Sequence, residues 1–241
     1  MREIRSFLSS RYPHLYRAVK NMWYGMLSSL TGIPKHQRLF EKMYNINHWG
    51  NIESRSGPGS NLVNSSIIRR ELPKLISELK AKSILDIPCG DFYWMKLVDL
   101  HETKYIGADI VRPMIEQHIR LFPSEYRRFV VCDLLNDPLP IADVVLCRDC
   151  LPHLSFSDIQ KAFYNIRRSG TSYLITSTYP DRSENTDIET GRFRPLNLMA
   201  PPFNFPPPVK LINEGYSDSH NNCGDKSIAV WKISDLMEIY F

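Results

Sequence analysis

Short apolar runs alternate along this chain with stretches in which apolar residues recur at helical spacing. The runs predict buried strands at residues 83–87, 104–110, 127–133, 142–147 and 171–178. The helical spacing predicts helices over residues 64–82, 92–100, 112–122 and 155–168. Strands and helices that alternate in this way indicate an α/β fold, Rossmann-like and doubly wound, with a mostly parallel sheet.

The pattern changes beyond this core. Residues 179–208 are rich in proline and show no periodicity, and a loop of this length in a compact domain is usually functional. We expect it to contact the substrate. Apolar runs at 209–216 and 226–233 then predict an antiparallel pair that closes a seven-stranded sheet.

The N-terminal part differs in character from the core. Residues 49–61 are dense in glycine and serine and predict a loop, and the residues before them predict helical segments. We therefore expect an N-terminal helical extension with a lid-like loop at 1–61, followed by the main domain at 62–241. A plain linker is the other interpretation of the loop.

Charge is spread unevenly over the chain. Residues 1–40 contain seven lysines and arginines and one acid, whereas the net charge of the whole chain is +4, so the remainder is slightly acidic. The acidic remainder disfavours nucleic acid as a partner. The basic arm fits a cover over the substrate cleft, a partner contact, or weak peripheral contact with an anionic membrane. Nothing in the sequence specifies an oligomeric state.

The cysteine and hydropathy patterns indicate the cellular compartment in which we expect the protein. The chain has five cysteines, an odd number, mostly inside predicted strands, which predicts buried thiols in a reducing compartment. No apolar run reaches the length of about 18 residues that a membrane span needs, and the first residues lack the apolar core of a secretory signal. We expect a cytoplasmic protein without a membrane span.

Acidic residues stand where the predicted strands end. Asp86, Asp109 and Asp133 follow the first three strands, and Arg148 with Asp149 follows the fourth. An open α/β sheet binds its ligand at the carboxyl ends of its strands. Asp109 also follows Asp86 at about the 20-residue separation between a nucleotide-binding turn and its ribose-binding acid.

The turn after the first strand discriminates between nucleotide ligands. A dinucleotide pyrophosphate needs several glycines and a helix N-terminus, but this turn has only Gly90, and Asp91 adds an anion. An NAD-type oxidoreductase is therefore disfavoured. S-adenosylmethionine has no phosphate and carries a sulfonium cation, which carboxylates suit. Asp109 could accept from its ribose hydroxyls and Asp133 from its adenine amino group.

Four motifs in register resemble class I S-adenosylmethionine-dependent methyltransferases. They read Asp86-Ile-Pro-Cys-Gly-Asp-Phe92, Tyr105-Ile-Gly-Ala-Asp-Ile110, Val131-Cys-Asp-Leu134 and Asp143-Val-Val-Leu-Cys-Arg-Asp-Cys-Leu-Pro-His-Leu154. The first motif departs from the family pattern, since Pro88 and Phe92 replace two glycines. The resemblance implies a methyltransferase with S-adenosylmethionine as its cofactor. It places cofactor binding on Asp86, Pro88, Gly90, Asp91, Asp109, Ile110, Asp133, Leu134 and Arg148.

Three further stretches resemble a bacterial subgroup associated with glycan and capsule biosynthesis. They are the loop that begins at Trp49, the Cys147–Leu154 stretch, and the Gly191-Arg-Phe-Arg-Pro-Leu-Asn-Leu198 stretch together with the proline-rich segment at 201–208. The resemblance implies O-methylation of a sugar or glycan intermediate. Arg192, Arg194 and Asn197 are then candidates for substrate binding, because arginine forks bind phosphate or carboxylate; ordinary solvated loop charge is the alternative.

Methyl transfer to an alcohol needs a base. His153 is the first candidate because its ordinary pKa lies near neutrality, and Asp149 is the second. A structural histidine is the competing interpretation. Cys147, Cys150 and His153 also invite a zinc site with His220 and Cys223, but cysteines in and just after an apolar strand are more often core residues, so we predict no metal.

Two other functions fit the same features. An N-methyltransferase acting on a small amine would need less help from a base. A cofactor-binding subunit without catalysis would keep the carboxylates and use His153 as a scaffold. The acceptor, whether a small molecule or a glycan, is not specified by the sequence.

Overall fold

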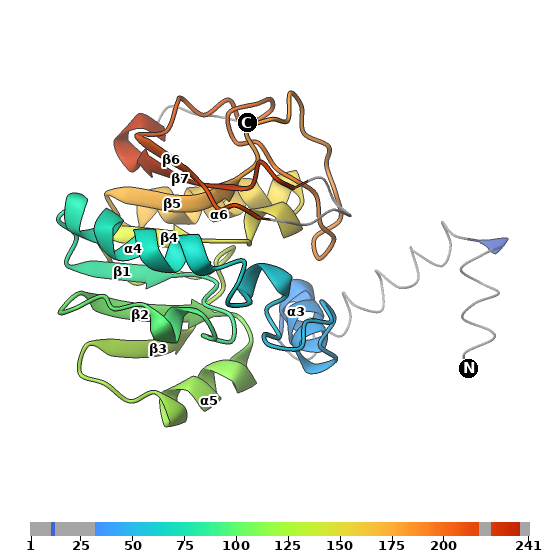
Figure 1. Cartoon of the computed structure of the whole chain (residues 1–241). Coiled ribbons are helices and arrows are strands. Elements are labelled where there is room, and N and C mark those ends of the chain that lie inside the picture. The colour runs from blue at the N-terminus through green and yellow to red at the C-terminus, as the bar shows by residue number, and fades with distance from the viewer. Residues whose placement is uncertain (1–10, 13–31, 217–222, 237–241) are drawn as a thin grey trace.

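The computed structural model describes residues 11–12, 32–216 and 223–236. In these residues seven strands form one sheet, in the order β3-β2-β1-β4-β5-β7-β6 (Figure 1). The first five pair in parallel, and β7 runs antiparallel to β5 and β6. The strands are β1 (Ser83–Asp86), β2 (Lys104–Asp109), β3 (Arg127–Val131), β4 (Val144–Cys147), β5 (Tyr173–Thr178), β6 (Lys210–Asn213) and β7 (Ser227–Lys232). The predicted fold class and its antiparallel closing pair are confirmed.

Helices cover both faces of the sheet. They are α4 (Ser66–Glu78) and α5 (Arg112–Leu121) on one face and α6 (Phe156–Arg168) on the other. Successive strand residues point to opposite faces, so Ile84 and Val144 pack with α4 while Leu85 and Val145 pack with α6. Burial on both faces explains why the strands read as continuous apolar runs.

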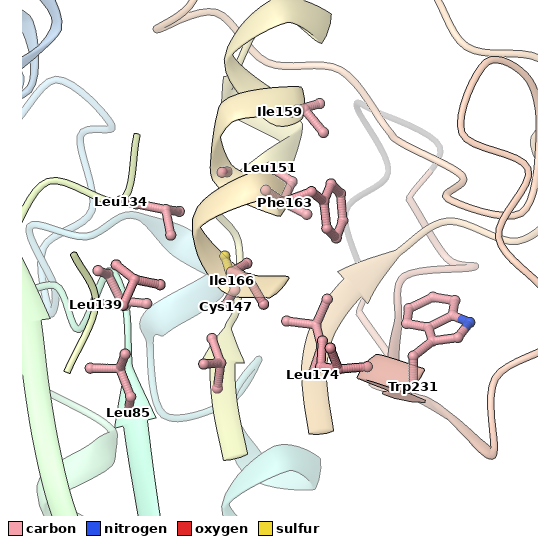
Figure 2. Packing of buried hydrophobic residues seen from close by; sticks show 14 of the residues in the cluster. Leu85, Leu134, Leu139, Cys147, Leu151, Ile159, Phe163, Ile166, Leu174 and Trp231 are labelled. Carbon is pink, nitrogen blue, oxygen red and sulfur yellow. The ribbon is translucent and has the colours of Figure 1, made fainter. Parts of the chain in front are cut away.

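Helix α6 shows how local sequence fixes one of these layers. Its buried residues recur at helical spacing, at Ile159, Ala162, Phe163 and Ile166. Ser155 caps its first turn, where the side-chain oxygen accepts a hydrogen bond from the Asp158 amide. Figure 2 shows Ile159, Phe163 and Ile166 packed among core residues from the neighbouring strands, including Leu174 and Trp231.

The helix predicted over residues 92–100 is wrong. Only a short 3-10 helix, Met95–Leu97, forms there. Phe92 has a φ of 59°, in the left-handed region, which an α-helix cannot continue through. Its ring is buried against four aromatic neighbours, and this packing outweighs the backbone cost. The neighbours are Tyr105, His118, Phe122 and Phe129.

The described part of the N-terminal extension contains α3 (Lys35–Asn45), at the edge of the sheet where the parallel strands end (Figure 1). Most of the basic arm, residues 1–10 and 13–31, lies outside the described residues. Within the described ranges, no helix is long and apolar enough to cross a membrane. The boundary at residue 61 stays a prediction.

Replacing Phe163 by alanine tests the packing of α6. The ring is buried, so its loss should lower the free energy of unfolding by about 3–5 kcal/mol. Tyr164→Ala is the matched control, because that neighbouring ring on the same helix is 61% exposed and should cost about 1 kcal/mol or less. Urea denaturation of both variants measures the difference, and equal losses would contradict the assigned packing.

Candidate active site

A cavity opens at the carboxyl ends of β1, β2 and β4. It contains about 1100 Å³ of space not filled by atoms, part of which is open to solvent. Most of the residues that the sequence predicts for cofactor binding and catalysis line this cavity. They are Asp86, Pro88, Gly90, Asp109, Ile110, Asp133, Leu134, Arg148, Asp149 and His153.

Asp86 and Asp109 bring two buried carboxylates to the cavity from the ends of β1 and β2. Asp86 accepts a hydrogen bond from the Tyr105 hydroxyl at 2.7 Å. Asp109 accepts from the amides of Val111 at 3.0 Å and Gly90 at 3.1 Å. Burial is the main cause that raises the pKa of Asp86 to about 7 and that of Asp109 to about 6. A cation or hydroxyl donors bound beside them would favour their charged forms.

The turn after β1 is shaped by a single glycine. Gly90 has a φ of 56°, and a Cβ there would run into the Ser56 hydroxyl of the glycine- and serine-rich loop. Asp91 fastens this loop, because its carboxylate accepts from the Ser54 hydroxyl at 2.9 Å and from the Arg55 amide at 2.8 Å. Asp91, predicted to bind cofactor, is not among the cavity-lining residues and instead binds the loop.

Helix α3 closes the cavity on the side of Asp133. Nε2 of His36 lies 2.7 Å from the Asp133 carboxylate. Burial alone would raise the pKa of Asp133, but the bonds from His36 and Asn136 hold it below its usual value. Phe40 and Tyr44, one and two helical turns further along, also line the cavity. The extension therefore contributes a wall of the site.

A buried ion cluster supports the opposite wall. Arg148 binds Glu214 at 2.8 Å and Asp149 at 3.1 Å, and Lys226 binds Asp149 at 2.6 Å and Glu214 at 3.3 Å. Two cations and two carboxylates balance, as buried charges require. Arg148 also donates to the backbone carbonyl of Gly59 at 2.9 Å. The loop at 49–61 is thus fastened at two points and forms a wall of the site.

These charges favour His153 over Asp149 as the candidate base. Burial opposes ionisation of Asp149, yet Arg148 and Lys226 hold its pKa well below its usual range, which makes it a weak base. Burial lowers the pKa of His153, so its imidazole is neutral near pH 7. Nδ1 of His153 lies 3.0 Å from the backbone carbonyl of Arg192. A carbonyl only accepts, so Nδ1 carries the proton and the lone pair is on Nε2.

The three predicted substrate-binding residues do not line the cavity. The Arg192 side chain is 74% exposed. Arg194 is buried and donates to backbone carbonyls of residues 151 and 152. Asn197 is buried and donates to the Pro180 and Arg182 carbonyls. Their role toward a substrate stays a prediction. In the structure Asn197 bonds within the 179–208 loop, and Arg194 attaches this loop to the turn at 151–152.

Several residues of the site were missed. The amphipathic spacing of His36, Phe40 and Tyr44 was a signal for α3, but nothing in the sequence placed that helix over the strand ends. Trp49 and Trp94 line the cavity, and Trp49 makes an edge contact with His153 at 6.0 Å between ring centroids. Glu214 and Lys226 became functional candidates only through the fold.

The zinc alternative finds no support in the described part of the chain. Cys147 and Cys150 are thiols, and no group of three His, Cys, Asp or Glu side chains among the described residues is arranged to hold a metal. His220, which would have completed the set, lies outside the described residues.

Comparison with known proteins places the fold. No family model and no curated sequence matches the chain, whereas many solved structures do. Human N-acetylserotonin methyltransferase, in complex with S-adenosylmethionine, covers 93% of this chain and 68% of its own, with a TM-score of 0.58 and 12% identity. This chain has the Rossmann-like methyltransferase fold.

Two further structures agree with that fold. The methyltransferase domain of bacterial CtHen1 matches over 70% of this chain and 99% of its own, with a TM-score of 0.52 and 14% identity. A protein from Pyrococcus horikoshii OT3 matches over 74% of this chain and 96% of its own, with a TM-score of 0.50 and 18% identity. At these identities the likeness shows the fold alone.

The raised pKa of Asp86 predicts that, without a bound ligand, the free energy of unfolding depends on pH. The folded state holds this proton up to about pH 7, whereas an ordinary aspartate loses it near pH 4, so raising the pH across this window lowers the free energy of unfolding. Asp86→Asn removes the effect. The free energy of unfolding of Asp86→Asn, minus that of the unaltered protein, should therefore increase by a few kcal/mol between about pH 4 and about pH 7. Each unit of pKa difference contributes about 1.4 kcal/mol.

Urea denaturation at the two ends of the window measures this difference. Glu102→Gln is the control, because the Glu102 side chain is exposed and lies outside the cavity, so this variant should show no comparable change. A constant difference for Asp86→Asn as well would contradict the burial of this carboxyl.

Proposed function

We propose that the protein transfers a methyl group from S-adenosylmethionine to a neutral hydroxyl compound. The observation that carries this proposal is the cavity lined by Asp86, Asp109 and Asp133, in a sheet with the methyltransferase fold. Three carboxylates at successive strand ends suit a nucleoside that has hydroxyl and amino donors, a positive charge and no phosphate.

The geometry after β1 argues against a dinucleotide. A pyrophosphate is bound by the backbone amides at a helix N-terminus. In the described chain between Asp86 and Lys104 there is no α-helix, only the short 3-10 turn at Met95–Leu97. Asp91 adds a carboxylate at the place where a phosphate would need amides.

The lining residues fit S-adenosylmethionine in detail. Asp109 has acceptor capacity left beyond its two amide bonds, and could take the ribose hydroxyls. Asp133 accepts from His36, Asn136 and Leu135, which leaves room for one more donor, such as an adenine amino group. Bound there, S-adenosylmethionine supplies an electrophilic methyl group on a cationic sulfur.

His153 gives the site a base for an alcohol acceptor. Its neutral imidazole, with the lone pair on Nε2, can take the hydroxyl proton as the oxygen becomes the nucleophile. This tautomer favours O-methylation by an enzyme over a non-catalytic cofactor-binding subunit. An amine acceptor remains the alternative, because it depends less on such a base.

The charges of the cavity favour a neutral acceptor. Arg148 and Asp149 belong to the balanced ion cluster. Outside that cluster, three aspartates and no lysine or arginine are among the described residues that line the cavity. The arginines once expected to bind an anionic group do not line the cavity. A neutral sugar or a neutral glycan intermediate, in the reducing cytoplasm, is the acceptor class we propose, with Trp49 offering a ring on which its apolar face could stack.

Calorimetric titration with S-adenosylmethionine and with NAD tests the choice of cofactor. We expect S-adenosylmethionine to bind and NAD not to bind. Asp109→Asn should weaken binding of S-adenosylmethionine about 10- to 100-fold, because hydrogen bonds to a charged acceptor contribute about 1.5–3 kcal/mol. Asp99→Asn should bind like the unaltered protein. Tighter binding of NAD would overturn the proposal.

Replacing His153 by alanine tests the assigned base. Turnover should fall about 10²- to 10⁴-fold, while the affinity for S-adenosylmethionine stays within about twofold. The measurement follows formation of S-adenosylhomocysteine with a panel of neutral sugars and their phosphorylated forms. A variant with full turnover would remove His153 from the mechanism, and a preference for the phosphorylated forms would refute the neutral acceptor.

A further inference from the structure

The turn that carries His153 is held by a segment of the long proline-rich loop. We call residues 187–194 the clasp. The main chain of the clasp meets this turn twice around His153: the Gly191 amide donates to the His153 carbonyl at 2.8 Å, and the Arg192 carbonyl accepts from Nδ1 of His153 at 3.0 Å. The clasp therefore fixes both the backbone and the ring of this residue.

Arg194 attaches the clasp to this turn through both its backbone and its side chain. Its amide and its Nη1 both donate to the Pro152 carbonyl at 3.1 Å, and Nη1 also reaches the Leu151 carbonyl at 3.5 Å. Its guanidinium lies over the Phe156 ring, 5.2 Å from the centroid. Among the described residues, Nε and Nη2 of Arg194 have no hydrogen-bond partner, so the hydrogen bonds of this side chain all go to the turn.

The clasp continues past the turn to the start of α6. Asp187 accepts from the Phe156 amide at 2.7 Å. The Thr190 hydroxyl accepts from the Ser155 amide at 3.0 Å and donates to Asp158 at 2.6 Å. The segment from Leu151 to Asp158 is thus bound along its length by one loop.

Close packing on the far side holds the clasp in place. Gly191 has a φ of 98°, and a Cβ there would lie 2.6 Å from a methyl group of Leu39 in α3. The clasp is therefore confined between α3 and the turn that it binds.

We propose that Arg194 is a positioning residue that acts through the turn at 151–153 to hold His153 with its proton on Nδ1 and its lone pair on Nε2. The proposal rests on the proposed function, in which Nε2 takes the proton of the acceptor. It assigns to Arg194 a task other than reading an anionic substrate. A lysine could reach one carbonyl but could not also stack its head group flat on Phe156.

Nitrogen-15 NMR of the histidine rings tests this inference without an acceptor or a cofactor. The full chain has seven histidines, and loss of one signal set in His153→Gln assigns the ring. At about pH 8, where a neutral ring is expected, Nδ1 of His153 should resonate as a protonated nitrogen. In Arg194→Met this resonance should shift toward a tautomer-averaged position, and Arg194→Lys should lie between the two.

Arg192→Ala is the matched control. It removes an exposed side chain but keeps the backbone carbonyl, so the ring should be unchanged. A proton on Nε2 of His153 in the unaltered protein would overturn the proposal, and this measurement does not depend on the folding of any variant. So would an unchanged ring in a folded Arg194→Met. Because the spectrum reports no methyl transfer, failure here is distinct from failure to bind S-adenosylmethionine.

Discussion

Burial of carboxylates at the ends of adjacent strands is the constraint on which this structure depends. Charged carboxylates are costly to bury without partners. Asp109 meets this cost with two backbone amides, Asp86 with the Tyr105 hydroxyl, and Asp133 with His36. Asp109 and Asp86 still have raised pKa values, so their charged forms are incompletely stabilised in the protein alone. A cationic nucleoside bound beside them would supply the missing partner.

The surrounding elements follow from the need to enclose these groups. The turn after β1 has one glycine because a single close approach, to Ser56, shapes it. Asp91 and Arg148 fasten the 49–61 loop from two sides. Helix α3 completes the enclosure, since it contacts Asp133 at one end and packs near Gly191 along its side. The extension is thus part of the candidate site, and the same helix touches both the Asp133 side of the cavity and the clasp.

The sequence predicted the features that local patterns encode. Apolar runs located the strands, and the acids that follow them could be placed at one edge because parallel strands end there together. The helix at 92–100 was mispredicted because burial of Phe92 among aromatic rings overrides the local pattern. Partners distant in sequence could not be predicted: His36 and Asp133 are 97 residues apart, and Arg148 and Glu214 are 66 apart. The sequence around Arg194 is the same whether its guanidinium binds a ligand or backbone carbonyls, so its role could not be predicted.

A crystal structure of the protein with S-adenosylhomocysteine tests the account most directly. It should show the ribose hydroxyls within hydrogen-bond distance of Asp109, the adenine beside Asp133 under α3, and the sulfur on the side of the cavity that contains His153. A nucleoside bound elsewhere, or bound in the cavity with Asp86 and Asp109 turned away from it, would contradict the central claim.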